Sequence, residues 1–302
     1  MKNAEPFRIK TIAEGHRLTG LEMPKHPLIS LVDVSQFKNH TDVHAVIFDF
    51  YAISIKRGCN NLLYGQQKYD FDEGLMAFMS PGQILRGEEG GAPAGLEGWM
   101  LFVHPDLLWN TPLAKKIKQY DFFSYASHEA LFLSEKEELI INDIIANIKQ
   151  EYDANIDGFS QGIIVAHLET LLSYAERFYN RQFITRKKAS HQLLEEMEEL
   201  LINYFDGDDL VSRGLPSVQF LADKLNVSSS YLSSLLKSLT GQTAQQHIHE
   251  KLIEKAKEKL STSALTVSEI AYDLGFEHPQ SFSKLFKAKT NVSPLEFRQS
   301  FN

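Results

Sequence analysis

The carboxy-terminal part of the chain contains the same pattern twice, and this repeat limits the possible fold more strongly than any other feature of the sequence. Leu221–Val227 aligns with Ile270–Phe276 at an offset of 49 residues, and Tyr231–Lys237 aligns with Ser281–Lys287 at an offset of 50. The difference of one residue falls between the two segments, where connecting turns tolerate insertions. Each copy is therefore predicted to be a helix, a tight turn and a second helix.

Residues that begin or end helices support this prediction. Thr266–Glu269 and Ser293–Glu296 have the Ser/Thr-x-x-Glu pattern of a capping box, which predicts the start of a helix. Asn226 and Gly275 stand at the entry to the turn, and both residue types tolerate left-handed backbone. Pro279 suits the first position of the helix that follows.

A stretch of seventeen residues, Gln245–Ser261, joins the two copies and has its apolar residues on one side. As a helix it would span roughly 25 Å. The second helix of each copy, about 10–12 Å across, fits the major groove of DNA, where base edges offer distinguishable donors and acceptors. Held by such a rod, the two second helices would lie about one DNA turn apart, roughly 34 Å. The repeat therefore favours binding to two successive major grooves of double-stranded DNA over an all-helical interaction domain.

The net charge of −8 has to be divided between the two ends of the chain before it bears on DNA binding. From Ser217 onward there are ten Lys and Arg against eight Asp and Glu, a net +2, so residues 1–216 carry −10. The acidity belongs to the front of the chain. The charge of the repeat permits DNA binding but does not by itself indicate it.

The amino-terminal part has the pattern of short β-strands. Apolar or alternating runs between turn residues predict strands at Leu28–Ser35, Ala45–Lys56, Asn61–Phe71, Leu75–Met79 and Gly98–Val103. Short strands at this spacing favour a sandwich or a barrel. Alternation does not say which side chains face inward, and Tyr51, Ile53 and Ile55 are expected to be ordinary core.

Two helices are predicted between the strands and the repeat. Ser134–Glu137 is a capping box at the start of one, and the other covers roughly Phe159–Tyr179. Their apolar faces are wide enough to pack on the strands and also to pair with a second subunit, so a homodimer is expected as an alternative to simple packing. The basic stretch that follows is the best candidate for a linker.

Other classes of protein find no support in the sequence. No run approaches the length of a membrane span, and no apolar stretch follows the first residues, so neither a membrane protein nor a secretory signal is expected. The single cysteine, Cys59, excludes an intramolecular disulfide and is typical of a reducing cytosol. A lone cysteine is more often a small apolar residue than a redox sensor. We expect a cytoplasmic protein.

The repeat resembles the AraC/XylS family of bacterial transcription regulators. The similarity is strongest at Ile270–Phe276, Ser281–Lys287 and Ser293–Arg298, and it covers about residues 190–302. Two positions depart from the family pattern: Asn291 stands where glycine is usual, although asparagine also tolerates a left-handed cap, and Ala244 stands where proline is frequent. The resemblance implies a DNA-binding regulator, more often an activator, that is not an enzyme and needs no cofactor.

The resemblance also implies which side chains face the bases. They are Ser230, Ser233 and Ser234 in the first unit and Gln280, Ser283 and Lys284 in the second. The family often has arginine or glutamine in the first unit, whereas serine is short and relatively indiscriminate. The first unit is therefore expected to contribute register and the second unit more of the specificity. Lys237 and Lys287 are expected to touch phosphate.

The amino-terminal part more faintly resembles the cupin-type effector barrel of many such regulators, at Tyr69–Gly74 and Phe78–Gly82. Cupin enzymes hold a metal through closely spaced histidines and a glutamate. The histidines here are scattered, at His16, His26, His40 and His44. The pair His247 and His249 lies in the joining helix, where residues two apart face away from each other. No metal site is expected.

The predicted fold is α+β, with an N-terminal cupin-like β-barrel and following helices, and a C-terminal all-α domain of two helix-turn-helix units. The predicted parts are an effector-binding and dimerisation domain at 1–182 (barrel about 1–110, helices about 130–180), a linker at 183–190, and a DNA-binding domain at 191–302 with units at about 217–239 and 266–290. Expected partners are double-stranded DNA, a small-molecule effector, a second copy of the chain and RNA polymerase. Two alternatives stay open: a constitutive dimeric regulator without an effector, and a cupin-type enzyme with a DNA-binding tail. The sequence names neither the effector and its contacts nor the operator.

Overall fold

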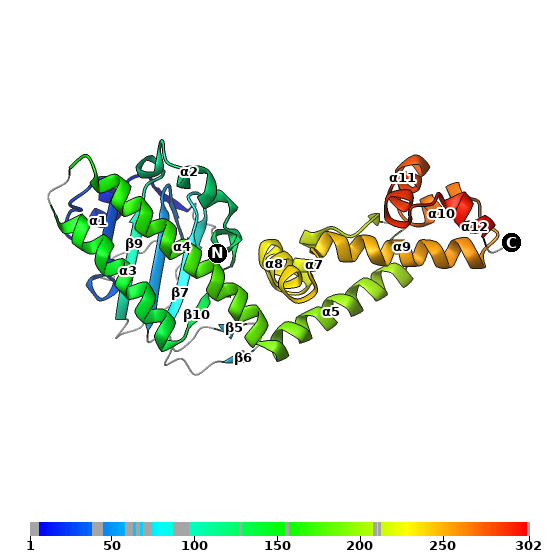
Figure 1. The fold of residues 1–302 in the computed structure, drawn as a ribbon, viewed down its shortest axis with the longest axis horizontal. Coiled ribbons are helices and arrows are strands. Elements are labelled where there is room, and N and C mark those ends of the chain that lie inside the picture. The colour runs from blue at the N-terminus through cyan, green and yellow to red at the C-terminus, as the bar shows by residue number, and fades with distance from the viewer. Residues whose placement is uncertain are drawn as a thin grey trace. The chain divides into compact units, whose positions relative to one another are not determined.

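The computed structural model is an α+β protein (Figure 1). It describes residues 6–37, 45–57, 63–64, 67–68, 74–86, 97–126, 129–154, 157–207, 210 and 213–300. The chain divides into two compact units, Met1–Gln182 and Phe183–Asn302, each with its own buried side chains.

The amino-terminal unit is built on a five-stranded antiparallel sheet in the order β10-β7-β4-β9-β2. A three-stranded sheet, β1-β3-β8, and a two-stranded sheet, β5-β6, accompany it. The strands are β1 (Phe7–Ile9), β2 (Ile29–Asp33), β3 (Ala45–Phe48), β4 (Tyr51–Arg57), β5 (Leu63–Tyr64), β6 (Gln67–Lys68), β7 (Gly74–Met79), β8 (Ile84–Arg86), β9 (Glu97–Val103) and β10 (Leu131–Leu133).

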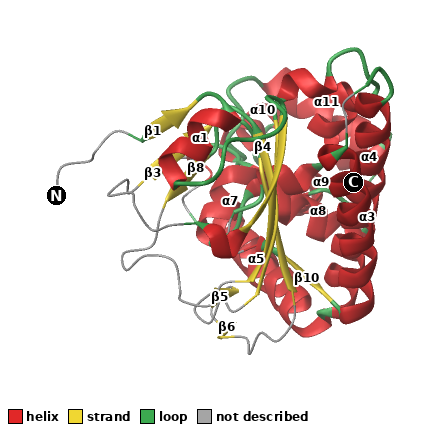
Figure 2. Ribbon diagram, turned by 90° about the vertical axis from the view of Figure 1, so that its left-hand side faces the viewer, coloured by secondary structure: helices red, strands yellow, loops and turns green. Residues whose placement is uncertain are grey.

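Helices cover one face of the five-stranded sheet. Figure 2 shows α3 (Glu135–Asp153) and α4 (Ser160–Thr185) on that face, and α1 (Ile12–Thr19) with the three-stranded sheet on the other. The capping box that starts α3 at Ser134 is confirmed. The shorter helical segments are α2 (Leu113–Lys116), η1 (Val34–Gln36), η2 (Pro105–Leu108), η3 (Ile117–Gln119) and η4 (Asp121–Ser124).

Side chains of β4 alternate between these two layers. Tyr51, Ile53 and Ile55 are buried on the helical side, as ordinary core, and the Tyr51 ring lies 5.1 Å from that of Phe123. Ala52 points the other way, into a cluster with Phe50, Phe102 and the residues of β1 and α1. The sheet therefore has an apolar layer on each side.

The expected barrel is not found, because the described strands form open sheets that do not close. The predicted strand Ala45–Lys56 is in fact β3 and β4, which belong to different sheets. The chain bends between them at Asp49 and Phe50, and the Phe50 ring packs 5.0 Å from Phe48 and 5.4 Å from Phe102. Apolar residues on both sides of the bend hid it in the sequence. Most of Asn61–Phe71 lies outside the described residues.

Residues 183–190, expected as a linker, are helical on both sides of Arg186. Helix α4 continues to Thr185, and α5 (Lys187–Asp206) begins directly afterwards, inside the stretch expected as a linker. The stretch is basic but contains neither glycine nor proline, and Lys and Arg are good helix formers, so the helical structure is interrupted only at Arg186.

The carboxy-terminal unit is helical throughout its described elements. After α5 come α7 (Val218–Lys224), α8 (Ser229–Thr240), α9 (Ala244–Thr262), α10 (Val267–Asp273), α11 (Pro279–Thr290) and α12 (Pro294–Gln299). Helix α9 is the predicted rod, and its buried face consists of Ala244, Ile248, Leu252, Ile253, Ala256 and Leu260. Both α8 and α10 pack on it, so α9 supports both helix-turn-helix units. None of the described helices combines the length and apolarity needed to cross a membrane.

Candidate nucleic-acid interface

The two helix-turn-helix units have the same dimensions. Helices α7 and α10 are seven residues long, and α8 and α11 are twelve residues long. The first helices begin 49 residues apart and the second helices begin 50 residues apart, which confirms the offsets of the sequence repeat.

Left-handed backbone occurs where the residue types predicted it. In the turns, Asn226 has a φ of 54° and Gly275 a φ of 80°. Gly241 ends α8 at a φ of 77°, and Asn291 ends α11 at a φ of 64°. Asn291 therefore serves as the cap where the family usually has glycine.

The second helices of the two units begin differently. The hydroxyl of Ser228 accepts a hydrogen bond from the backbone N–H of Tyr231, at 3.1 Å, and so caps α8. Helix α11 begins at Pro279 as predicted, and the side chain of His278 before it does not cap the helix. His278 is exposed beside the helix start, which makes it a further candidate for DNA contact. The sequence did not single it out, since it lies before the predicted helix.

Each second helix carries a polar stripe opposite its buried face. The stripe consists of Ser230, Ser233, Ser234 and Lys237 on α8, and of Gln280, Ser283, Lys284 and Lys287 on α11. Members of a stripe are three or four residues apart and therefore share a face of the helix. None of the eight is buried. The buried residues behind them are Tyr231, Leu232, Leu235 and Leu236 on α8 and Phe282 and Phe286 on α11.

The three stripe lysines differ in their surroundings, since Lys287 interacts electrostatically with the Glu296 carboxylate. Lys237 and Lys284 take part in no ion pair within the part of the chain that the structure describes. By contrast, three lysines of the rod α9 have acidic partners: Lys251, Lys255 and Lys259. Lys237 and Lys284 are therefore available to phosphate or to base edges, while three lysines of α9 are already paired with carboxylates.

The titratable side chains that the structure describes do not assemble a metal site. No group of three or more His, Cys, Asp or Glu side chains with suitable placement occurs among the described residues. His16 is buried, with its ring 2.9 Å from the hydroxyl of Ser30. His247 and His249 form hydrogen bonds with different side chains. Three further candidates lie outside the described residues: His40, His44 and Cys59.

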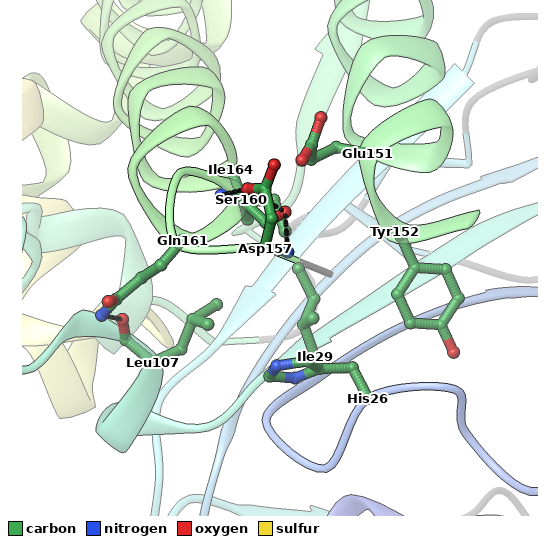
Figure 3. Close-up of a pocket in the computed structure, with 9 residues that line it drawn as sticks. All are labelled: His26, Ile29, Leu107, Glu151, Tyr152, Asp157, Ser160, Gln161 and Ile164. Carbon is green, nitrogen blue, oxygen red and sulfur yellow. Dashed lines mark hydrogen bonds between the residues drawn. The ribbon is translucent and has the colours of Figure 1, made fainter. Parts of the chain in front are cut away.

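A small pocket in the amino-terminal unit lies between the end of α3 and the start of α4 (Figure 3). It measures about 70 Å³, and its walls include His26, Ile29, Glu151, Tyr152, Asp157 and Gln161. Burial lowers the pKa of His26 below its usual value, and its Nδ1 accepts a hydrogen bond from the backbone N–H of Leu28. Asp157 accepts from the N–H groups at the start of α4. These groups serve local structure, and the pocket is smaller than typical ligand sites, which begin at about 300 Å³.

Comparison with known proteins places the similarity in the repeat. Residues 221–300 match the family described as the helix-turn-helix domain. The transcriptional activator RhaS of Escherichia coli O157:H7 is 37% identical over 79 residues, which are 26% of this chain and 28% of RhaS. Histidine kinase P4 of Formosa agariphila is 27% identical over 139 residues, 45% of this chain and 10% of the kinase.

Among solved structures, the C-terminal domain of the response regulator yesN from Fusobacterium nucleatum is 32% identical, with a TM-score of 0.30. The match covers 37% of this chain and 98% of that domain. The chain thus spans from a tenth to less than a third of the two curated relatives. These comparisons do not assign roles to individual residues of the stripes. The proposed contacts of those residues with DNA stay predictions.

Proposed function

We propose that the whole chain is a sequence-specific, DNA-binding transcription regulator, whose residues 221–300 are a helix-turn-helix domain of the AraC/XylS type. One observation carries the proposal. Helices α8 and α11 present equivalent polar stripes from two units on one rod, with their apolar residues turned inward. Because the stripe side chains are not buried in the unit, they are available to the edges of base pairs.

The two stripes read successive major grooves in this proposal. Helix α9 has 19 residues and therefore spans roughly 28 Å. With the bodies of the two units added, α8 and α11 reach grooves about one DNA turn apart, roughly 34 Å. A single molecule then covers one face of the duplex.

The two stripes contribute unequally to specificity. Gln280 can bond an adenine with both atoms of its amide, and Lys284 can donate to the acceptors of guanine. The serines of α8, Ser230 and Ser233, have one hydroxyl each and distinguish bases weakly. We propose that α8 mainly positions the protein along the DNA and that α11 mainly discriminates between sequences. Lys287 then contacts a phosphate of the DNA backbone.

We further propose that the amino-terminal unit responds to a small-molecule effector. The support is a row of small or half-buried side chains on the five-stranded sheet, facing the three-stranded sheet. Ser54 of β4 pairs with Ala77 on one side and with Met100 on the other, and both partners are only half-buried. A cupin-like arrangement of the sheets would enclose a ligand there. The effector would act by favouring one arrangement of the DNA-binding units over another.

A second copy of the chain is the partner we propose for the exposed side of α4. Phe159, directly before α4, and Ile163, one turn further along the chain, are 77% and 41% exposed. Trp109 is 72% exposed, and its backbone carbonyl accepts a hydrogen bond from Gln161 of α4. Exposed aromatic side chains of this kind are frequent anchors of protein interfaces. Replacing Phe159 with Asp should reduce the molar mass that sedimentation reports; an unchanged mass would count against this interface.

Activation of transcription is the proposed outcome, with RNA polymerase as the further partner in the bacterial cytoplasm. RhaS, the relative named above, is an activator. A constitutive regulator would bind its operator equally well with and without effector, so effector-dependent DNA affinity separates the two proposals. A cupin-type enzyme would retain a metal on purification, which elemental analysis would detect.

The experiment that tests DNA binding is selection of duplexes from a random pool by the purified chain. Enriched duplexes are then mapped by hydroxyl-radical footprinting at fixed salt. We expect two protected patches on one face, about one DNA turn apart. One patch would contradict simultaneous reading by α8 and α11, and no enrichment would contradict sequence-specific binding. A screen of small molecules against this binding would then identify the effector.

A further inference from the structure

Two glycines from distant parts of the carboxy-terminal unit meet at the turn of the second helix-turn-helix unit. Gly275 lies in the turn between α10 and α11, and Gly214 lies in the segment between α5 and α7. A Cβ atom on Gly275 would lie 2.9 Å from the Cα of Gly214 and 2.9 Å from the carbonyl oxygen of Leu210. Contacts of Cβ atoms below 3.0 Å essentially never occur, so a side chain at this position would displace the backbone beside it.

Left-handed backbone alone does not require the glycine. Asn226 occupies the equivalent turn of the first unit at a φ of 54°, and Asn291 caps α11 at a φ of 64°. Asparagine is thus accepted at two left-handed positions of this unit, and Gly275 at 80° lies in the same region. What distinguishes Gly275 is the close approach of Leu210 and Gly214.

Tyr204 holds this approaching segment in place. Its hydroxyl donates a hydrogen bond of 2.8 Å to the carbonyl oxygen of Gly214. Its ring, which is 4% exposed, packs on Phe220 of α7 with the ring centres 5.2 Å apart. Leu210 is also buried, at 2% exposure. Tyr204 therefore contacts the first helix-turn-helix unit directly and the second one through Gly214.

We propose that Tyr204, Leu210 and Gly214, here called the strap, fix the orientation of the second helix-turn-helix unit relative to the first. The two units are then joined by the strap as well as by α9. The inference rests on the proposed function, in which α8 and α11 bind one DNA molecule simultaneously.

The strap would affect how readily the second helix-turn-helix unit binds after the first unit has bound. Once one unit is bound, the other meets its half-site at an effective concentration that depends on its position and freedom. A second connection removes rotations that a single rod permits, so less freedom is lost on binding. Positioning by the strap thus affects binding to two half-sites and leaves the contacts at either half-site unchanged.

Two substitutions in the full chain test this role. Tyr204→Phe removes only the hydroxyl that bonds Gly214 and keeps the ring on Phe220. Gly275→Asn keeps a residue type that accepts left-handed backbone but adds the Cβ that the strap excludes. Tyr174→Phe is the matched control, because it removes a tyrosine hydroxyl from the amino-terminal unit, which contains no residue of the strap.

The DNA probes are a duplex selected from a random pool by the unaltered chain, two versions with one half-site scrambled, and one with an extra base pair between the half-sites. The measured quantity is the ratio of affinities for the complete and the scrambled duplexes. Tyr204→Phe should reduce this ratio about five-fold, as expected for the loss of one buried hydrogen bond. Gly275→Asn should reduce it further, and both variants should tolerate the extra base pair better than the unaltered chain does.

The outcomes separate the strap from the proposed function. If both variants keep the ratio of the unaltered chain, including the case of an equal loss of affinity for complete and scrambled duplexes, the proposed role of the strap is contradicted. If the unaltered chain does not prefer the complete duplex, reading by both units fails, and the strap loses its role with it. The proposal is supported if both strap variants have a reduced ratio and Tyr174→Phe does not. Their affinity for a duplex with a single half-site should be unchanged, which also shows that the variants are folded.

Discussion

Lys255 of the rod α9 lies 2.8 Å from Asp206, the last residue of α5, and joins the two helices at a point of the chain between Tyr204 and Leu210 of the strap. The hydrogen bond from Lys255 lowers the pKa of the Asp206 carboxyl below its usual value, and the same bond raises the pKa of Lys255. The Asp206 side chain is largely exposed, so the pair contributes little to the free energy of folding. Its main effect is to fix where α5 ends relative to α9.

The pair predicts a dependence of stability on pH. The folded pKa of Asp206 lies below its unfolded value, so the stabilisation is present above the unfolded pKa and is lost as the pH falls through the folded pKa. Asp206→Asn should therefore lower the urea midpoint slightly at pH 7, and the difference from the unaltered chain should shrink below pH 3.8, the ordinary pKa of Asp. Glu195→Gln, at an exposed position of α5, is the control. A difference that does not change with pH would argue against the ion pair.

Unequal reading by the two stripes predicts unequal losses on substitution. Lys284→Ala should weaken binding to a selected duplex about ten-fold, because a good contact to a base is worth about 1–3 kcal/mol. Ser233→Ala should cost less. A gel-shift assay at constant salt measures both, and Lys257→Ala on the exposed side of α9 controls for the lost charge. Equal losses for Lys284→Ala and Ser233→Ala would contradict the proposal that α11 contributes more to sequence specificity than α8.

Contact with phosphate predicts a change in salt dependence rather than in sequence preference. Lys237→Ala and Lys287→Ala should each weaken binding to all duplexes uniformly and reduce the slope of log affinity against log salt by about one. Titrations at several salt concentrations on matched and mismatched duplexes measure this. A variant that keeps its slope but changes its preferred sequence would show that the lysine reads bases instead.

The capping box at the start of α10 predicts a stability effect without a change in the stripes. Thr266 Oγ1 accepts from the backbone N–H of Glu269 at 3.2 Å, and the Glu269 carboxylate accepts from the N–H of Thr266 at 2.6 Å. The bond from this backbone N–H lowers the pKa of Glu269. Thr266→Ala should destabilise the chain by about 1 kcal/mol in urea unfolding. Thr266→Ser should restore most of the loss, and Ser268→Ala, in the exposed first turn, should change little.

The core of the second unit depends on Phe286. This ring is fully buried, 5.8 Å from Phe282 and 5.5 Å from Phe297. Phe286→Ala should cost about 3–5 kcal/mol and abolish DNA binding through loss of the fold. Leu295→Ala, at a side chain that is 56% exposed, should change stability by less than about 0.5 kcal/mol. Thermal unfolding by circular dichroism compares the two, and similar midpoints would contradict the described core.

The carboxy-terminal unit could be predicted closely because its signals are local. Thr266, Ser293 and Pro279 each mark a helix start through contacts within one turn, and the structure has all three in those roles. The exposure of both stripes followed from the same periodicity. Whether their side chains touch bases was inferred from a resemblance and awaits measurement.

Long-range contacts explain what the sequence did not reveal. The bend at Phe50 depends on rings from other strands, and an apolar run looks the same with or without it. Gly275 was understood from its backbone angle alone, since its contact with Gly214 joins residues 61 positions apart. The strands likewise pair with partners far along the chain, so their closure into a barrel could not be judged from spacing.

The separation of stripe and core within α11 has an engineering consequence. Gln280, Ser283 and Lys284 lie outside the core, whereas Phe282 and Phe286 hold the helix. Variants randomised at Gln280, Ser283 and Lys284 should keep the melting temperature of the unaltered chain while their preferred operator sequence changes. The same fold could then be given a new DNA specificity by changing the residues that face one major groove and leaving those that face the other.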